Sequence, residues 1–226
     1  MNMTPGNAGS PHDRLIEGLA SDLQPVRPLP SPGKRALTWL AVVAVVAVLL
    51  ASIADLSALT HRLMAVPDMW LAMIGSTLTA VLAALAAFQL SLPDRSRAWA
   101  WLPLPSAVLW IGASGAGCLR AWFVPDTHPA DMNDMRDCLL FILGLSVPLS
   151  ALLFLMLRQA YPLQPGLTAA IAGLAAAAAA ATLLNLFHPY DAAATDLAVH
   201  AVAVALVIIL SRAFGARAFS RTNYQN

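Results

Sequence analysis

The sequence predicts an all-α polytopic membrane protein, with six transmembrane helices in one bundle and both termini in the cytoplasm. Three observations support this prediction. Of the 226 residues, 59% are hydrophobic and only 11% are charged, whereas soluble domains carry about a quarter charged residues. Six apolar segments reach the roughly 20 residues that a helix needs to span a bilayer. The basic residues are also divided unequally between the segments that flank these spans.

The chain divides into three expected regions. Residues 1–35 form a mostly polar cytoplasmic N-terminal arm, residues 36–215 form the six-helix transmembrane domain, and residues 216–226 form a cytoplasmic tail. Because a long polar segment precedes the first apolar run, we expect that run to be a retained anchor rather than a cleaved signal peptide.

The arm has the pattern of a short amphipathic helix followed by a proline-rich spacer. Ser10, Pro11 and Asp13 are typical of a helix start, since they supply a capping side chain, a proline at the first position and an acid in the first turn. An apolar stripe at helical spacing follows, made of Leu15, Ile16, Leu19, Ala20 and Leu23. Pro25 ends the helix, and the prolines after it predict an extended spacer with a reach of about 35 Å.

The apolar stripe needs a surface to cover it, because a helix of three or four turns is marginal alone. The helix carries Asp13, Glu17 and Asp22 against a single Arg14, which disfavours binding to anionic lipid. Two alternatives are left: packing on the cytoplasmic loops of the same chain, or binding in a groove of a partner protein. The long spacer favours the partner.

Small residues and prolines mark the expected helix contacts. The spans are expected near residues 36–56, 69–91, 98–119, 138–157, 166–187 and 196–215. Small residues, which let helices pack closely in lipid, recur in the second span and near the end of the third, at Gly75, Thr79, Ala83 and Ala87 and at Gly112, Gly115 and Gly117. Prolines predict kinks or offsets at Pro103, Pro105 and Pro148.

The flanking charges predict the orientation. With the N-terminus inside, the inner segments hold Arg14, Arg27, Lys34, Arg35, Arg95, Arg97, Arg158, Arg212, Arg217 and Arg221, and the outer segments hold only Arg62, Arg120 and Arg136. Because cytoplasmic loops carry the excess of Lys and Arg, both termini are expected in the cytoplasm.

The spans also exclude several classes of function. No Asp, Glu, Lys, Arg or His lies in the middle of a span, which disfavours a pump or a proton-coupled transporter. No nucleophile elbow, phosphate loop or pair of carboxylates is found in a span, so we expect no enzyme. The net charge of +1 gives no basic field for direct binding of nucleic acid. A small-solute carrier and a structural partner subunit of a membrane complex are the alternative functions.

Both cysteines and four of the five histidines are expected at the outer boundary of the membrane, at Cys118, Cys138, His61, His128, His188 and His200. In a Gram-negative bacterium this compartment is oxidising, so Cys118 and Cys138 are candidates for a disulfide if their Cα atoms lie within about 7 Å. Thiolate and imidazole groups are equally suited to a soft metal ion. The other alternative is that the cysteines only pack and the histidines are solvated.

Four segments in this order and spacing resemble a known family: LIEGLASDLQPVRPLPSPGKRAL (15–37), LPDRSRAW (92–99), DCLLFILGLSVPLSALLFLMLRQAYPLQPGL (137–167) and HPYDAAATDLAVHAVAV (188–204). Together they are similar to the NrsF-like family, the negative regulators of sigma F, over roughly residues 13–215. The resemblance implies a six-span anti-sigma factor of the bacterial inner membrane. Its cytoplasmic arm would hold an extracytoplasmic-function sigma factor, and its periplasmic cysteines would respond to metal or oxidative stress.

The resemblance also implies roles for particular residues. The sigma-contacting arm would run from Leu15 to Arg27, Cys138 would be the sensing cysteine, and His200 would match the histidine that enters the last span. The candidate sigma contacts are Leu15, Ile16, Leu19, Asp22, Leu23 and Arg27. The chain departs from the family at His188, where a second cysteine is expected before Pro-x-Asp. Either Cys118 substitutes for that cysteine, or Cys138, His188 and His200 hold a soft metal ion.

Overall fold

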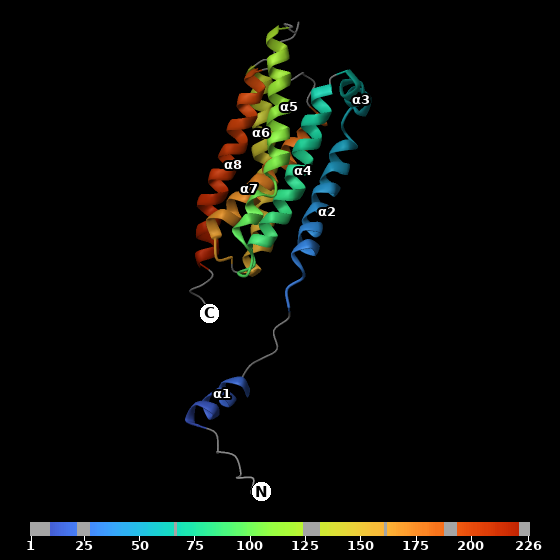
Figure 1. The fold of residues 1–226 in the computed structure, drawn as a ribbon. Coiled ribbons are helices and arrows are strands. Elements are labelled where there is room, and N and C mark those ends of the chain that lie inside the picture. Colours follow the sequence, from blue (N-terminus) through green and yellow to red (C-terminus); the bar gives the residue numbers. More distant parts are fainter. Residues whose placement is uncertain are drawn as a thin grey trace, which may run out of the picture.

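The described part of the chain is almost entirely helical (Figure 1). The computed structural model describes residues 10–21, 28–65, 67–123, 132–160, 162–187 and 194–221, and no strand occurs in these ranges. The helices are α1 Pro11–Ser21, α2 Pro32–Ala51, α3 Leu56–Ala65, α4 Pro67–Leu90, α5 Leu104–Phe123, α6 Met132–Leu157, α7 Pro165–Leu184 and α8 Ala194–Arg221, with short 3₁₀ helices η1 Arg97–Trp101 and η2 Arg158–Ala160. The all-α prediction is confirmed.

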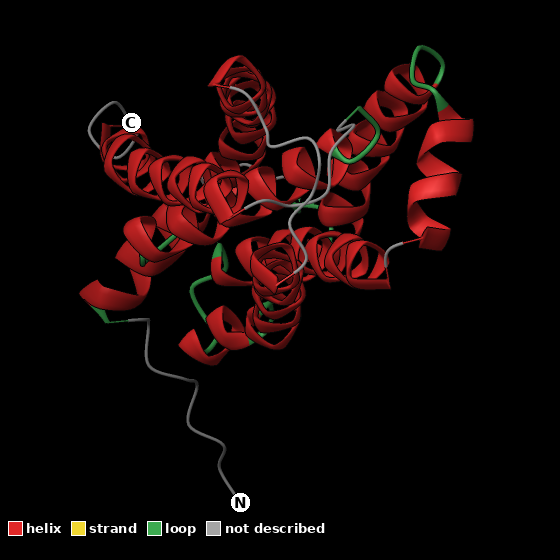
Figure 2. Cartoon of the chain, turned by 90° about the horizontal axis from the view of Figure 1, so that it is seen from above, coloured by secondary structure: helices red, strands yellow, loops and turns green. Residues whose placement is uncertain are grey.

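The long helices run up and down between the two ends of one bundle (Figure 1). We name the end nearest α1 the arm end; α2 begins there and α8 finishes there. The opposite end, the far end, carries α3 and the start of α6. In Figure 2, which looks from above, α3 is the helix at the right-hand edge of the bundle, after the loop that follows α2. It is seen from its side, so it is not parallel to the long helices.

Four of the six expected spans are confirmed as helices that are long and apolar enough to cross a membrane. They are Pro32–Ala51, Met69–Leu90, Arg136–Ala160 and Pro165–Leu184. The other two expected spans fall on α5 and on a shorter apolar helix, Ala201–Gly215, within α8. The count of six, and the compartment that each end faces, stay predictions.

The boundaries differ from the expected ones where local chemistry ends or begins a helix. The first span was expected at 36–56, but α2 ends at Ala51 and a separate helix, α3, begins at Leu56. Asp55 starts α3, because its Oδ1 accepts hydrogen bonds from the backbone N–H groups of Ser57 and Ala58, both at 3.0 Å. The third span begins late, at Leu104, after Pro103, as the expected proline offset predicts.

Helix α7 occupies the centre of the bundle. In its most apolar stretch 72% of the residues are buried, against 17% in α2. All seven alanines from Ala175 to Ala181 are buried, and α4, α6 and α8 pack around them. Small side chains let helix backbones approach closely in lipid. The mean hydropathy of this alanine-rich segment is 2.0, equal to that of α2 and α4, so α7 is as apolar as these neighbours and also central.

Hydroxyl groups link α7 and α5 to α4 inside the bundle. Thr182 donates to Ser76 Oγ at 2.9 Å, and Thr79 donates to Ser106 Oγ at 3.1 Å. Such contacts contribute modestly in membranes, about 0.6 kcal/mol on average. They fix the register of neighbouring helices more than they hold the helices together.

The glycines show which small residues form contacts. On the expected small face of α4, Ala83 and Ala87 are fully buried, and a Cβ added at Gly75 would lie 2.7 Å from the backbone nitrogen of Trp110 in α5. The expectation of packing at Gly112 and Gly115 is wrong, because a Cβ at either position would meet nothing within 4 Å.

The substitution Gly75→Ala is expected to destabilise the bundle by about 1–3 kcal/mol, the usual range for overpacking, because the new methyl group would collide with backbone. Its matched control is Gly112→Ala, in which the methyl group enters open space and stability should not fall. Thermal unfolding of both variants in detergent measures the difference. Equal stability of the two would contradict the close approach of α4 and α5.

Candidate functional site: the exposed arm and the far-end cluster

Helix α1 has a complete N-terminal cap. The Ser10 hydroxyl accepts a hydrogen bond from the backbone N–H of Asp13 at 3.2 Å, and the Asp13 carboxylate accepts one from the backbone N–H of Ser10 at 2.7 Å. This reciprocal pair is a capping box with Asp in the place of the usual Glu. The helix start predicted from Ser10, Pro11 and Asp13 is confirmed.

The apolar stripe of α1 is exposed. Leu15, Ile16 and Leu19 each keep about 60% of their surface open (60%, 63% and 63%), and no residue of α1 is buried. Large apolar side chains grouped on one exposed helix face are typical of a surface that a partner covers. The remaining candidate contacts, Asp22, Leu23 and Arg27, lie outside the described residues.

After residues 22–27, which the structure does not describe, Pro28 to Ser31 are non-helical and lead directly into α2.

Two side chains in the first turns of α2 attach this helix to the bundle. Trp39 is fully buried and Arg35 is 5% exposed. Sequence reasoning missed this contact, because it counted Arg35 only as a flanking charge. The available signal was an arginine one turn before a tryptophan on the same helix face, directly at the start of an apolar run.

At the far end, Cys138 is a free, buried thiol in an apolar cluster. The cluster, which we name the far-end cluster, joins three helices through Cys138 and Ile142 of α6, Ala180 and Leu184 of α7, and Ala203 of α8. The rings of Phe141 and Phe187 pack beside it, with centroids 5.8 Å apart.

The other predicted sensor residues are placed only by their helix or by their position in the sequence. His200 lies on α8 three residues before Ala203, which places both on one helix face; its side chain is outside the described set. His188 follows Leu184 by four residues and lies outside the described residues. Cys118 is on α5, whose contacts are with α4 and α8, and its side chain is also outside the described set.

The side chains of Cys138, His188 and His200 can be compared with the donors that a soft metal ion prefers. A thiolate and two imidazoles are donors that such ions accept, and Cys138 marks where α6, α7 and α8 meet. No group of three or more metal-ligating side chains occurs among the residues that the structure describes. The donor types therefore fit, and the joint geometry of Cys138, His188 and His200 stays a prediction.

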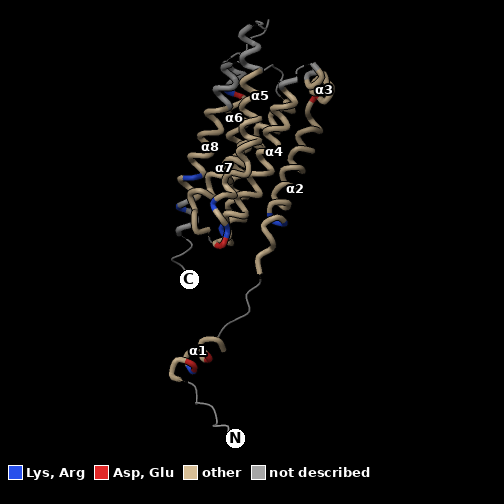
Figure 3. The backbone as a smooth tube through the Cα atoms, in the orientation of Figure 1, with Lys and Arg blue, Asp and Glu red and all other residues tan. Residues whose placement is uncertain are grey.

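The charges separate between the two ends of the bundle (Figure 3). At the arm end, where α2 begins and where α4, α6 and α8 finish, the chain places most of the described basic residues of the bundle beside one acid, Asp94: Lys34, Arg35, Arg95, Arg97, Arg158, Arg212 and Arg217. The far end shows Asp55, Arg136 and Asp137. The arm and the basic ends of the helices therefore lie on the same side of the bundle.

Together these features define a class: a helical bundle whose helices are long and apolar enough to cross a membrane, preceded at its basic end by an exposed amphipathic helix. The chain matches the family model NrsF, described as negative regulator of sigma F, over residues 19–220, and it belongs to this family. A sigma factor is the partner that membership implies, and the description is that of a regulator rather than an enzyme. No curated protein and no solved structure matches the chain.

Proposed function

We propose that the protein is an anti-sigma factor of the bacterial inner membrane. In this proposal the arm holds an extracytoplasmic-function sigma factor in the cytoplasm, and a redox or metal signal at the periplasmic far end releases it. Family membership supports the sigma factor as partner. The exposed stripe of Leu15, Ile16 and Leu19 is the observation on which the assignment of the arm rests.

The physical state of the arm supports this role. A short helix that exposes three large apolar side chains is only marginally stable in water, so a groove that buries the stripe stabilises both the helix and the complex. Burying each of these side chains fully is worth about 1.5–3 kcal/mol. Helix α1 lies away from the bundle (Figure 1), where a sigma factor has access to it.

The charge distribution supports a cytoplasmic arm. Basic residues concentrate at the arm end of the described bundle, and the cytoplasmic side of membrane proteins carries the excess of Lys and Arg. The far-end cluster with Cys138 then faces the periplasm, which is the compartment in which disulfides form.

The signal would act as a differential binding event. A hundredfold loss of sigma-factor affinity requires the signal to favour the released state by about 2.7 kcal/mol. A disulfide typically changes the stability of a fold by about 2–4 kcal/mol, and a structural metal ion by about 10–16 kcal/mol. A disulfide between Cys118 and Cys138, or a metal ion held by Cys138, His188 and His200, is therefore large enough to supply this difference.

The full-length protein in detergent should capture its sigma factor, and Leu19→Asp should weaken capture at least about tenfold, because it places a charge in the middle of the stripe. The matched control is Ser21→Asp, which adds the same charge about 200° further around the helix, on the opposite face. Binding is measured with purified extracytoplasmic-function sigma factors of the host. Capture that survives Leu19→Asp, or that both substitutions abolish equally, would refute the stripe as the contact.

Substitution of the sensor residues separates the two signals. If a disulfide is the signal, Cys118→Ser alone should stop release of the captured sigma factor by the thiol oxidant diamide. If a metal is the signal, Cys118→Ser should leave release by cadmium intact, and His188→Ala or His200→Ala should stop it. Undiminished release by both agents from the Cys118→Ser, Cys138→Ser double variant would show that the signal enters elsewhere.

A further inference from the structure

The helix that carries the arm is most deeply buried in its first turns, and Leu40 and Val43 after them are partly buried against the main cluster. Arg35, Ala36 and Trp39 of α2 are buried, whereas Val45, Val48 and Leu49 are 59%, 69% and 63% exposed. The outer two-thirds of α2 therefore presents a largely apolar surface suited to lipid. The position of α2, and of the arm that precedes it, depends on the contacts of its first turns.

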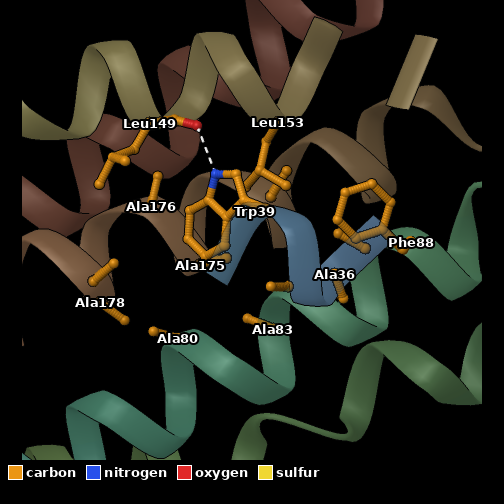
Figure 4. Close-up of a cluster of buried hydrophobic side chains, with 14 of the residues drawn as sticks. Ala36, Trp39, Ala80, Ala83, Phe88, Leu149, Leu153, Ala175, Ala176 and Ala178 are labelled. Carbon is orange, nitrogen blue, oxygen red and sulfur yellow. Dashed lines mark hydrogen bonds between the residues drawn. The ribbon is translucent and has the colours of Figure 1, made fainter. Parts of the chain in front are cut away.

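Both polar contacts in these turns bind the backbone of α6. The Trp39 indole Nε1–H donates to the Leu149 carbonyl at 3.2 Å inside the main buried cluster (Figure 4). The Arg35 guanidinium donates to the Met156 carbonyl and lies 4.9 Å from the centre of the Phe88 ring of α4. Met156 is in the last turn of α6, where carbonyls lack helical partners and a cation is favourable. Because carbonyls cannot rotate independently of their helix, a movement of α6 displaces the acceptors of these two side chains, while α2 also packs on α4.

Helix α6 is interrupted by a proline between the far-end cluster and the two carbonyls that accept these hydrogen bonds. Pro148 lies inside the helix; it lacks an N–H, and its ring crowds the carbonyl of Gly144. The buried Oγ atoms of Ser146 and Ser150, on either side of the proline, have no hydrogen-bond partner. Serines can bond to the carbonyl one turn earlier and bend a helix. A Cβ at Gly144 would meet nothing within 4 Å, so close packing does not explain this glycine.

Segment 144–150 lies where α6 passes from one buried cluster to another, and its Leu145 packs against both. The far half of α6 contributes Cys138 and Ile142 to the far-end cluster, and the near half contributes Leu149, Leu153 and Leu157 to the main cluster that includes Trp39. Helix α7 also crosses both clusters, but it is enclosed by its neighbours, and all its described hydrogen bonds to other helices lead to α4.

We propose that α6 is the element that transmits a change at the far-end cluster to the arm. Its far half tilts about Pro148, its near half shifts, and Arg35 and Trp39 carry α2 and the base of the arm with it. Arg35 and Trp39 are positioning residues: they act on the arm through α2 and touch no partner. The biological meaning of this coupling rests on the proposed function, but the coupling itself is a property of the bundle.

The test uses the full chain in lipid nanodiscs, with Cys118→Ala and Cys138→Ala, and spin labels on Ser31→Cys and Asp94→Cys at the arm end. The substitution Ala203→Phe overpacks the far-end cluster and replaces the signal. It should change the mean distance between the labels by about 2 Å, the size of helix shifts in known switches. The control is Val202→Phe, which adds the same ring at a neighbouring position that is 55% exposed and should change nothing.

Two further variants test the route of transmission. Pro148→Ala restores the N–H bond to Gly144 at a lipid-exposed position, and Trp39→Phe keeps an aromatic ring but removes the donor; each should reduce the shift to that of the control. A shift that persists in both variants, or no shift with Ala203→Phe in a folded protein, would overturn the proposal. Ala203→Val serves as the milder overpacking variant, with the same criteria, where the Phe variant does not fold.

Because these distances are measured without a sigma factor, failure of sigma capture by the unmodified protein would overturn the proposed function alone. Where capture holds, Pro148→Ala should bind the sigma factor with unchanged affinity, but the hundredfold loss of affinity on treatment with diamide or cadmium should not occur. Normal release from Pro148→Ala would overturn the coupling alone.

Discussion

The bundle depends on how closely its helix backbones can approach α7. Lipid chains are as apolar as leucine, so no hydrophobic force drives helices together within a bilayer, and packing has to supply the attraction. The small side chains of the buried alanines Ala175–Ala181 let the backbones of neighbouring helices come close to α7. At Gly173, an added Cβ would lie 2.6 Å from the Ser211 side chain of α8. This close packing fixes α6 and α8 around α7, and it thereby assembles the far-end cluster around Cys138.

The attachment of α2 follows a different physical principle. It relies on one large ring and one guanidinium, both bonded to carbonyls of α6, and its outer surface is open. A helix held in this way can shift without disrupting the alanine-based packing behind it. The bundle thus combines a rigid centre with a peripheral helix, and the peripheral helix is the one that leads to the arm. This arrangement suits the proposed function, in which the protein keeps its fold while it changes the presentation of the arm.

Hydropathy and periodicity predicted most of the helices, but not the separate helix α3 and not which helices are neighbours. The capped arm helix, four spans and the small face of α4 follow from local spacing, because each is decided within a few residues. Small residues at Gly75 and at Gly112 look alike in the sequence, yet only Gly75 has a helix against it. The acceptor of Arg35 lies 121 residues away, so its role is set by tertiary packing. Asp55 shows the opposite case: its capping of α3 is a local signal that the prediction of one long span overlooked.

In the proposed topology the arm lies in the cytoplasm and the far end of the bundle lies on the opposite side of the membrane. Single cysteines at the exposed positions Ser31→Cys and Ser57→Cys, in a chain without its native cysteines, report this topology through their reaction with a membrane-impermeant maleimide. We expect Ser57→Cys to react in intact spheroplasts and Ser31→Cys to react only in inside-out vesicles. Labelling of Ser31→Cys from outside, or of both positions from the same side, would contradict it.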